Sequence, residues 1–255
     1  MLRLTVSRAG AALLLALLCA VPRGPALAAD SRVLHSLLDG VLETAVKDGY
    51  VDYPAIARNV RFYKYIEAIA EFDTASLASD AERLAFWINA YNALAIKAVI
   101  DGVTPVTMTG RLKFFRTIDH RVGGENLDLK SIVADKLAPL GEPRVHFALV
   151  PATFAAPKLR SEAYRADELE RQLNENLRDF VNDKRKNRYS AVTQTAKLST
   201  LFEEHAAEFG ADDAAVLVFI ARSIADEAVA KVLARGTYAI DYMEYDWSIN
   251  GRPLD

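Results

Sequence analysis

The segment 143–157, PRVHFALVPATFAAP, carries the side chain whose chemistry is easiest to name, the imidazole of His146. The alternation of apolar residues around it predicts a strand from Arg144 to Val150. An imidazole can act as a general base for a nearby nucleophile. The hydroxyls within reach along the chain belong to Thr153 and Ser161, and no spacing rule places either of them beside His146. A histidine on an apolar strand is usually a satisfied structural residue, and that is our first interpretation.

The alternative is catalysis without a cysteine. In that hypothesis the chain is a hydrolase in which His146 works with a carboxylate, a hydroxyl or a metal ion. Arg144 and Asn89 would then orient the substrate or stabilise negative charge in the transition state. These three residues are the catalytic candidates.

His35 and His205 fall in segments with the apolar periodicity of amphipathic helices. Helical metal sites place their ligands three or four residues apart, and at that spacing these histidines have only ordinary carboxylates, Asp39 and Glu208. The spacing does not indicate a metal site in either helix. We expect the protein to use no cofactor.

His120 stands beside Asp119 in a predicted hairpin. It could approach His146 only if the fold paired the two predicted strands. Two imidazoles and a carboxylate are ligands that zinc accepts, so His120, His146 and Asp119 form a possible zinc set that we do not favour.

The stretch Leu84 to Ile100, LAFWINAYNALAIKAVI, has apolar residues almost all round a helical projection, which predicts a buried helix with Trp87 and Tyr91 in the core. Asn89 and Asn92 are three residues apart and share one face. Buried amides need hydrogen-bond partners, so we expect them to tie the helix to neighbouring backbone. The alternative is that one lines a site, and Asn92, Tyr91 and His120 are the candidate binding residues.

Five segments together resemble a known family, the domain of unknown function 547 (DUF547). They are VDYPAI at 51–56, FWINAYNALAIK at 86–97, PRVHFALV at 143–150, AAPKLRSEAY at 155–164 and YDWSIN at 245–250. The resemblance implies an Asn-Cys pair after the His146 strand, then Ser-Cys-Pro, and hence Cys-His chemistry. In this sequence Val150 and Pro151 stand for the first pair and Ala155 and Ala156 for Ser-Cys, while Val133 replaces an acidic residue.

The resemblance therefore implies a family member without the family's usual cysteines. We expect a non-catalytic binding or accessory protein of the cell envelope, not an enzyme. Its ligand would be a peptide, an envelope polymer or a protein partner.

Residues 1–28 have the pattern of a secretory signal peptide: Arg3 and Arg8, an apolar run over 11–21, and Ala-Leu-Ala at 26–28. Cleavage after Ala28 would leave a single domain, 29–255, in the periplasm or outside the cell. The one cysteine, Cys19, lies in the removed segment, so the mature chain would have no thiol.

The expected mature chain is mildly acidic, because losing Arg3, Arg8 and Arg23 from 31 Lys and Arg leaves 28 against 34 Asp and Glu. Such a balance disfavours nucleic acid as a partner. The basic run 184–188 is expected to be a solvated helix end. No segment after the leader is long and apolar enough to predict an integral membrane span.

The remaining pattern predicts an α+β fold with about seven helices around the buried central helix, 84–101. Four regions read as strands: a hairpin within 115–129, 144–150, 189–198 and 238–247. A single long helix is expected from Asp212 to Arg235. Because the strands cluster after residue 115 and do not alternate with helices, we expect a small, largely antiparallel sheet.

Overall fold

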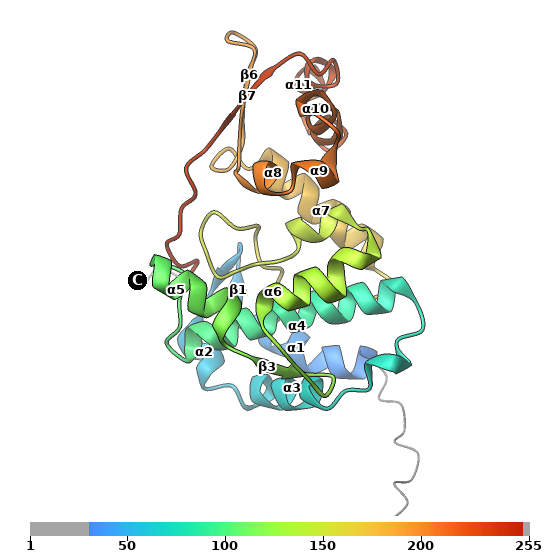
Figure 1. Ribbon diagram of the computed structural model, residues 1–255, viewed down its shortest axis with the longest axis vertical. Coiled ribbons are helices and arrows are strands. Elements are labelled where there is room, and N and C mark those ends of the chain that lie inside the picture. The colour runs from blue at the N-terminus through green and yellow to red at the C-terminus, as the bar shows by residue number, and fades with distance from the viewer. Residues whose placement is uncertain (1–30, 252–255) are drawn as a thin grey trace, which may run out of the picture.

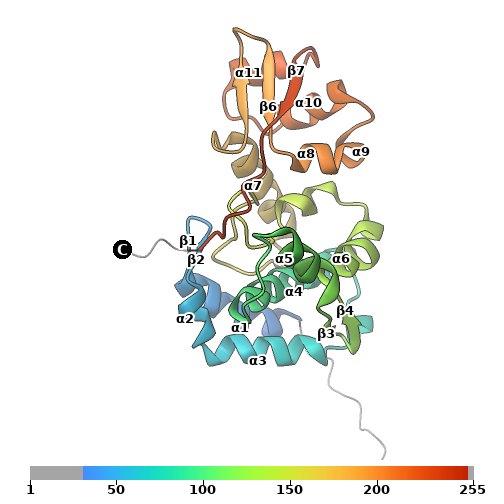
Figure 2. The same ribbon diagram turned by 60° about the vertical axis from the view of Figure 1, so that its left-hand side comes forward.

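The computed structural model describes residues 31–251, so the predicted signal peptide and Cys19 lie outside the described residues. Figures 1 and 2 show a broad helical base and a smaller lobe, with α7 between them. The helices are α1 (Ser31–Ala45), α2 (Tyr53–Ala57), α3 (Val60–Ala70), α4 (Asp80–Ile100), α5 (Met108–Leu112), α6 (Leu129–Ser131), α7 (Leu169–Asn182), α8 (Leu201–Glu204), α9 (Ala206–Phe209), α10 (Asp213–Ala221) and α11 (Glu227–Leu233).

Seven short strands form three separate sheets within residues 31–251. They are β1 (Val46–Lys47), β2 (Tyr50–Val51), β3 (His120–Val122), β4 (Glu125–Leu127), β5 (Arg188–Ser190), β6 (Thr195–Leu198) and β7 (Ala239–Tyr242). The pairs β1–β2, β3–β4 and β5–β6 are antiparallel, whereas β7 joins β6 in parallel. The α+β class is confirmed, but the expected single sheet is wrong.

The buried helix is confirmed as α4, which begins at a capping box. The Ser79 hydroxyl accepts a hydrogen bond from the Glu82 backbone N–H, and the Glu82 carboxylate accepts one from the Ser79 N–H. Trp87 and Tyr91 are each 4% exposed. Because apolar residues lie all round α4, other elements of the base can pack on every side of it, as Figure 1 shows.

The predicted hairpin at 115–129 is present but shorter, with His120 opposite Leu127. Gly123 and Gly124 form its turn with φ of 59° and 81°, a left-handed backbone that glycine adopts without strain. Their N–H groups donate to the carbonyl oxygens of Ile69 and Ala70, each at 2.8 Å, which fixes the turn against the end of α3.

The predicted strand 144–150 is wrong, because residues Pro143–Phe147 form a 3₁₀ helix. Pro143 occupies its first turn, where the missing N–H costs nothing, and the Glu142 carboxylate accepts a hydrogen bond from the Arg144 N–H at 3.0 Å. These two local signals outweigh the β propensity of the valine and phenylalanine that follow.

The predicted single helix 212–235 is also wrong. It is divided into α10 and α11, because Asp226 caps α11 by accepting from the Ala228 N–H at 2.9 Å. The amide of Asn182, at the end of α7, binds the intervening turn through Ser223 O and Ala225 N. Breaks of this kind raise the number of α-helices in residues 31–251 to eleven, against about seven predicted.

The buried apolar residues form two clusters. The first cluster surrounds α4 and takes residues from α1 to the start of α7. The second cluster contains Phe147, the end of α7, β6 and α8 to α11. The C-terminal segment 243–251 leaves β7 and returns to the base, where Asn250 accepts a hydrogen bond from the Tyr53 hydroxyl at 2.6 Å (Figure 1). Within residues 31–251 no helix has the length and hydropathy of a membrane span.

Candidate functional site

A cavity of about 420 Å³ lies where the two clusters meet. Tyr91 and Leu149 line it from the first cluster, and Leu201 and His205 line it from the side of the second. Tyr245 and Trp247 of the C-terminal segment complete the wall together with His146. Its size falls in the range of small-molecule sites. Its lining is largely apolar, with a few polar groups that converge on it.

His146 lines this cavity and contacts two other titratable residues, Glu208 and His205. Its Nε2 lies 2.8 Å from Oε2 of Glu208, and Nδ1 of His205 lies 3.3 Å from Oε1 of the same carboxylate. The two imidazole rings are stacked, with centroids 3.6 Å apart. His146 and His205 both line the cavity, whereas Glu208 contacts both histidines without lining it.

The titration of this cluster follows from its burial and its charges. Burial lowers the pKa of His205, and the neighbouring His146 lowers it further, while Glu208 acts in the opposite direction. Burial acts to raise the pKa of Glu208, but hydrogen bonds and charge from the two histidines outweigh it and lower that pKa. The carboxylate is therefore ionised at neutral pH.

The positions that the DUF547 resemblance assigns to cysteines lie in the same cavity. Pro151, Ala155 and Ala156 line it together with His146. The hydroxyl of Thr153 is 2.7 Å from the Tyr245 hydroxyl and so is already hydrogen-bonded. Side chains that cannot attack a substrate therefore occupy the wall where the resemblance implies thiols.

This wall is held in an unusual backbone conformation. Ala152 has φ of 60°, in the left-handed region that non-glycine residues seldom adopt. The C-terminal segment fixes it: Asn250 N–H donates to Ala152 O at 3.2 Å and Phe154 N–H donates to Ser248 O at 2.7 Å. The YDWSIN segment thus shapes the cavity wall and also supplies two aromatic residues to it.

Asn89 and Asn92 are structural, and each clamps a backbone segment. The Asn92 amide donates to Ala148 O and accepts from Val150 N–H, both at 2.9 Å. The Asn89 amide makes the same pair of bonds with Tyr164, both at 2.8 Å. Asn92 therefore positions the chain that follows His146, without lining the cavity itself.

Arg144 does not face the cavity. Its guanidinium binds Glu142 at 2.6 Å and Glu170 at 2.7 Å, and these carboxylates raise its pKa. Arg144 joins the 3₁₀ helix to α7. Its position supports a structural role, whereas the sequence suggested that it could stabilise charge in a transition state.

His120 is not brought to His146. It is buried in β3. Burial is the main cause that lowers the pKa of His120, and the charge of Lys97 lowers it further, while the charges of Asp101, Asp119 and Asp128 act to raise it. Among the described residues, the group with metal-ligand geometry consists of His146, His205 and Glu208. The suggested His120, Asp119 and His146 zinc set is therefore not assembled.

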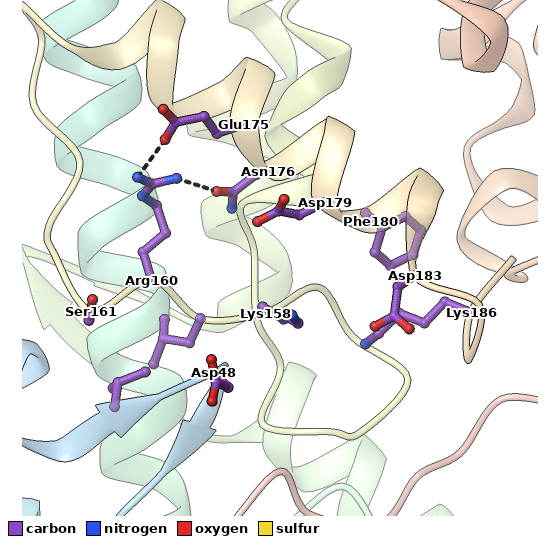
Figure 3. Close-up of a pocket in the computed structure, with 13 residues that line it drawn as sticks. Asp48, Lys158, Arg160, Ser161, Glu175, Asn176, Asp179, Phe180, Asp183 and Lys186 are labelled. Atoms are coloured by element: carbon purple, nitrogen blue, oxygen red, sulfur yellow. Dashed lines mark hydrogen bonds and ion pairs between the residues drawn. The ribbon is translucent and has the colours of Figure 1, made fainter. Parts of the chain in front are cut away.

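A second cavity, of about 410 Å³, has many charged and polar side chains in its lining and lies between the segment 158–161 and α7 (Figure 3). Arg160 spans it, donating to Glu175 at 2.9 Å and to Asn176 at 2.8 Å on α7. Ser161 lines this cavity, not the one that contains His146.

Lys186 lines the second cavity and also binds the backbone of the wall that borders the first. It is 8% exposed, so the expectation that 184–188 is a solvated helix end is wrong for this residue. Its ammonium donates to Phe154 O at 2.8 Å and to Ala156 O, and burial lowers its pKa to about 8. Through these two hydrogen bonds, Lys186 fixes the backbone on both sides of Ala155 in the cavity wall.

Sequence reasoning missed His205 and Glu208 as partners of His146. The hydrogen bond between His146 and Glu208 joins residues 62 positions apart, so no local spacing in the sequence indicates it. The sequence also did not indicate that Tyr245 and Trp247 of the YDWSIN segment line the cavity.

Comparisons with curated proteins and with solved structures returned no match. A family model described as "Protein of unknown function, DUF547" matches residues 75–181. This range includes α4, the 3₁₀ helix with His146, the wall 151–157 and most of α7, so it covers the first-cluster side of the cavity. The His205 and Glu208 side and the C-terminal segment lie beyond it. The match over residues 75–181 supports the assignment of this chain to the DUF547 family.

Proposed function

We propose that this protein is an exported, non-catalytic binding domain of the cell envelope. Its cavity beside His146 would take a small ligand with an apolar body and an anionic group. The observation that carries this proposal is the apolar wall of Pro151, Ala155 and Ala156 at the positions where the family resemblance implies thiols. The pattern of residues 1–28 supports export.

The anionic group is inferred from charge complementarity. Arg116 and Lys130 are exposed side chains that line the cavity, and neither forms a salt bridge with another part of the described chain. Glu204 is the acidic side chain in the lining. An apolar ligand with one carboxylate or sulfonate could place its ring or chain against Tyr91, and its charge toward the two cations.

Two fluorescent probes of similar shape test this proposal. Anilinonaphthalene sulfonate is apolar and anionic, whereas N-phenyl-1-naphthylamine is its neutral counterpart. We expect the protein to bind both, and Ala155→Phe to abolish both signals by filling the cavity. Ala191→Phe, at an exposed turn, is the matched control and should bind like the wild type.

The charge argument is tested separately with Arg116→Gln and Lys130→Gln. Each should weaken binding of the sulfonate by about 5- to 10-fold and leave the neutral probe unchanged, because each removes one cation from the mouth of the cavity. If Ala155→Phe binds both probes as well as Ala191→Phe does, the cavity is not the binding site and the proposal fails.

A second candidate function is a cysteine-independent hydrolase, and the observation that favours it is the 2.8 Å contact between His146 and Glu208. A carboxylate that orients an imidazole is a common arrangement for a general base. Turnover of ester, amide or peptide substrates that disappears in His146→Ala would establish this function. We expect no turnover, and no reaction of the mature chain with thiol-directed probes.

A further inference from the structure

We propose that His146, His205 and Glu208 form a binding site for one zinc ion, open to the cavity. Three potential ligand atoms, one from each residue, all lie within 4.8 Å of one another. In a tetrahedral site with zinc–ligand bonds of about 2.0–2.2 Å, the ligand atoms are about 3.3–3.6 Å apart. The contacts of 2.8 and 3.3 Å run to the two different oxygens of Glu208, so this carboxylate is within reach of a ring nitrogen of each histidine.

The chemistry of the three donors suits zinc. Two neutral imidazoles and one carboxylate are the ligand set of a known class of catalytic zinc sites. The two rings are stacked with centroids 3.6 Å apart, and each directs one ring nitrogen toward Glu208. An ionised carboxylate only accepts hydrogen bonds, so each of these nitrogens donates an N–H to Glu208, and a zinc ion would bind by displacing these protons.

The chain next to two of the three ligands, His146 and Glu208, is held in place before any ion binds. On either side of His146, the guanidinium of Arg144 is bound to α7 and the Phe147 carbonyl accepts from Asn176 at 2.9 Å. Phe209, next to Glu208, packs between Phe147 and Phe202 with ring centroids 5.4 and 5.3 Å away. A preorganised ligand set loses little conformational entropy when the metal binds.

The fourth position of the ion would face the cavity, because both histidines line it. Three protein ligands and one open position are typical of zinc sites that bind a water molecule or a ligand group. Glu204 lines the same cavity and acts electrostatically on His205, so it is suitably placed to accept a hydrogen bond from such a water. The site does not depend on the proposed apolar ligand, since its three donors are protein side chains.

The test uses the mature chain, freed of metal by dialysis against a chelator and then titrated with ZnCl₂ in competition with a chromophoric zinc indicator. We expect one zinc ion per chain. Glu208→Gln and His205→Ala should each weaken binding by about 100-fold or more, because each removes a ligand. Both side chains are partly solvent-exposed, at 45% and 30%, so these variants can fold.

Glu203→Gln and His120→Asn are the matched controls. Glu203 is an exposed glutamate five residues before Glu208, and His120 is a histidine outside the group. Both should retain full zinc binding. CoCl₂ gives an independent readout, because four-coordinate Co²⁺ absorbs strongly in the visible range, and that band should be present in the wild type and in Glu203→Gln but absent in Glu208→Gln.

Three results would overturn the proposal. The first is a wild-type chain that binds no zinc at micromolar concentration. The second is zinc binding that survives in both Glu208→Gln and His205→Ala. The third is binding lost equally in the controls, which would place the ion elsewhere. The probe-binding experiments with Ala155→Phe do not depend on metal, so failure of either proposal can be distinguished from failure of the other.

Discussion

Mild acid should destabilise the fold through His35, a buried histidine of α1 that lies outside the candidate site. Only 2% of His35 is exposed, its Nδ1 is 3.2 Å from the Tyr65 hydroxyl, and its buried Nε2 has no hydrogen-bond partner among the described residues. Burial lowers its pKa from 6.5 to about 4, with Asp39 acting to raise the pKa and Arg165 to lower it. The folded state therefore holds His35 neutral where the unfolded chain would protonate it.

The sign and the size of the effect follow from linkage. Above pH 6.5 the imidazole is neutral in both states, and this contribution to stability is fully present. As the pH falls from 6.5 to about 4 the unfolded state takes up a proton that the folded state does not, so the free energy of unfolding decreases. At about 1.4 kcal/mol per pKa unit, the total loss is about 3 kcal/mol, and it levels off below the folded pKa.

The measurement is urea denaturation of the wild type and of His35→Gln, followed by tryptophan fluorescence, from about pH 7 to about pH 4. Glutamine is polar and does not titrate. His120 and His205, whose pKa values are also lowered, are present in both proteins, so their effects cancel in the difference. The wild type should lose about 3 kcal/mol more than the variant over this range. A difference between the two proteins that stays constant with pH would refute the reasoning.

Three further predictions concern the core, the cavity frame and processing. Trp87→Ala should lower the free energy of unfolding by about 3–5 kcal/mol, because it leaves a large void beside α4; a loss below about 1 kcal/mol in urea denaturation would contradict this. Asn92→Ala should cost about 2–5 kcal/mol, because it strands the Ala148 carbonyl and the Val150 N–H without partners, whereas Asn174→Ala on exposed α7 surface should cost far less. N-terminal sequencing of the exported protein should begin at Ala29 or Asp30, and a chain that keeps Met1 would exclude cleavage.

The parts of the fold that could be predicted are those set by local signals. The helix α4 has a capping box at its start and apolar residues on every face. The first feature predicts where the helix begins, and the second predicts that it is buried. The hairpin turn at Gly123 and Gly124 is equally local. By contrast, the segment with His146 has a strand-like composition, and the Pro143 turn with its Glu142 cap decides its conformation instead.

The rest depended on contacts between residues far apart in the sequence. The break between α10 and α11 is stabilised by Asn182, some forty residues earlier, which no local pattern reveals. The site depends on such contacts even more strongly, because His146 comes from the 3₁₀ helix, whereas His205 and Glu208 come from the smaller lobe. A spacing rule that searches one helix at a time finds the pair His205 and Glu208, but it cannot reveal the contact of this pair with His146.

Because His146 lies at the junction of the two clusters, we expect changes at the site to affect the stability of the fold as well. Val145 and Ala148 belong to the first cluster, whereas Phe147 between them belongs to the second. A large change at His146 therefore disturbs packing on both sides, and lost binding in such a variant could reflect either the site or the fold. Glu208 is different, because its carboxylate is 45% exposed while it touches both histidines. A substitution there removes a ligand and leaves both apolar clusters intact, so Glu208→Gln separates the chemistry of the site from the stability of the fold.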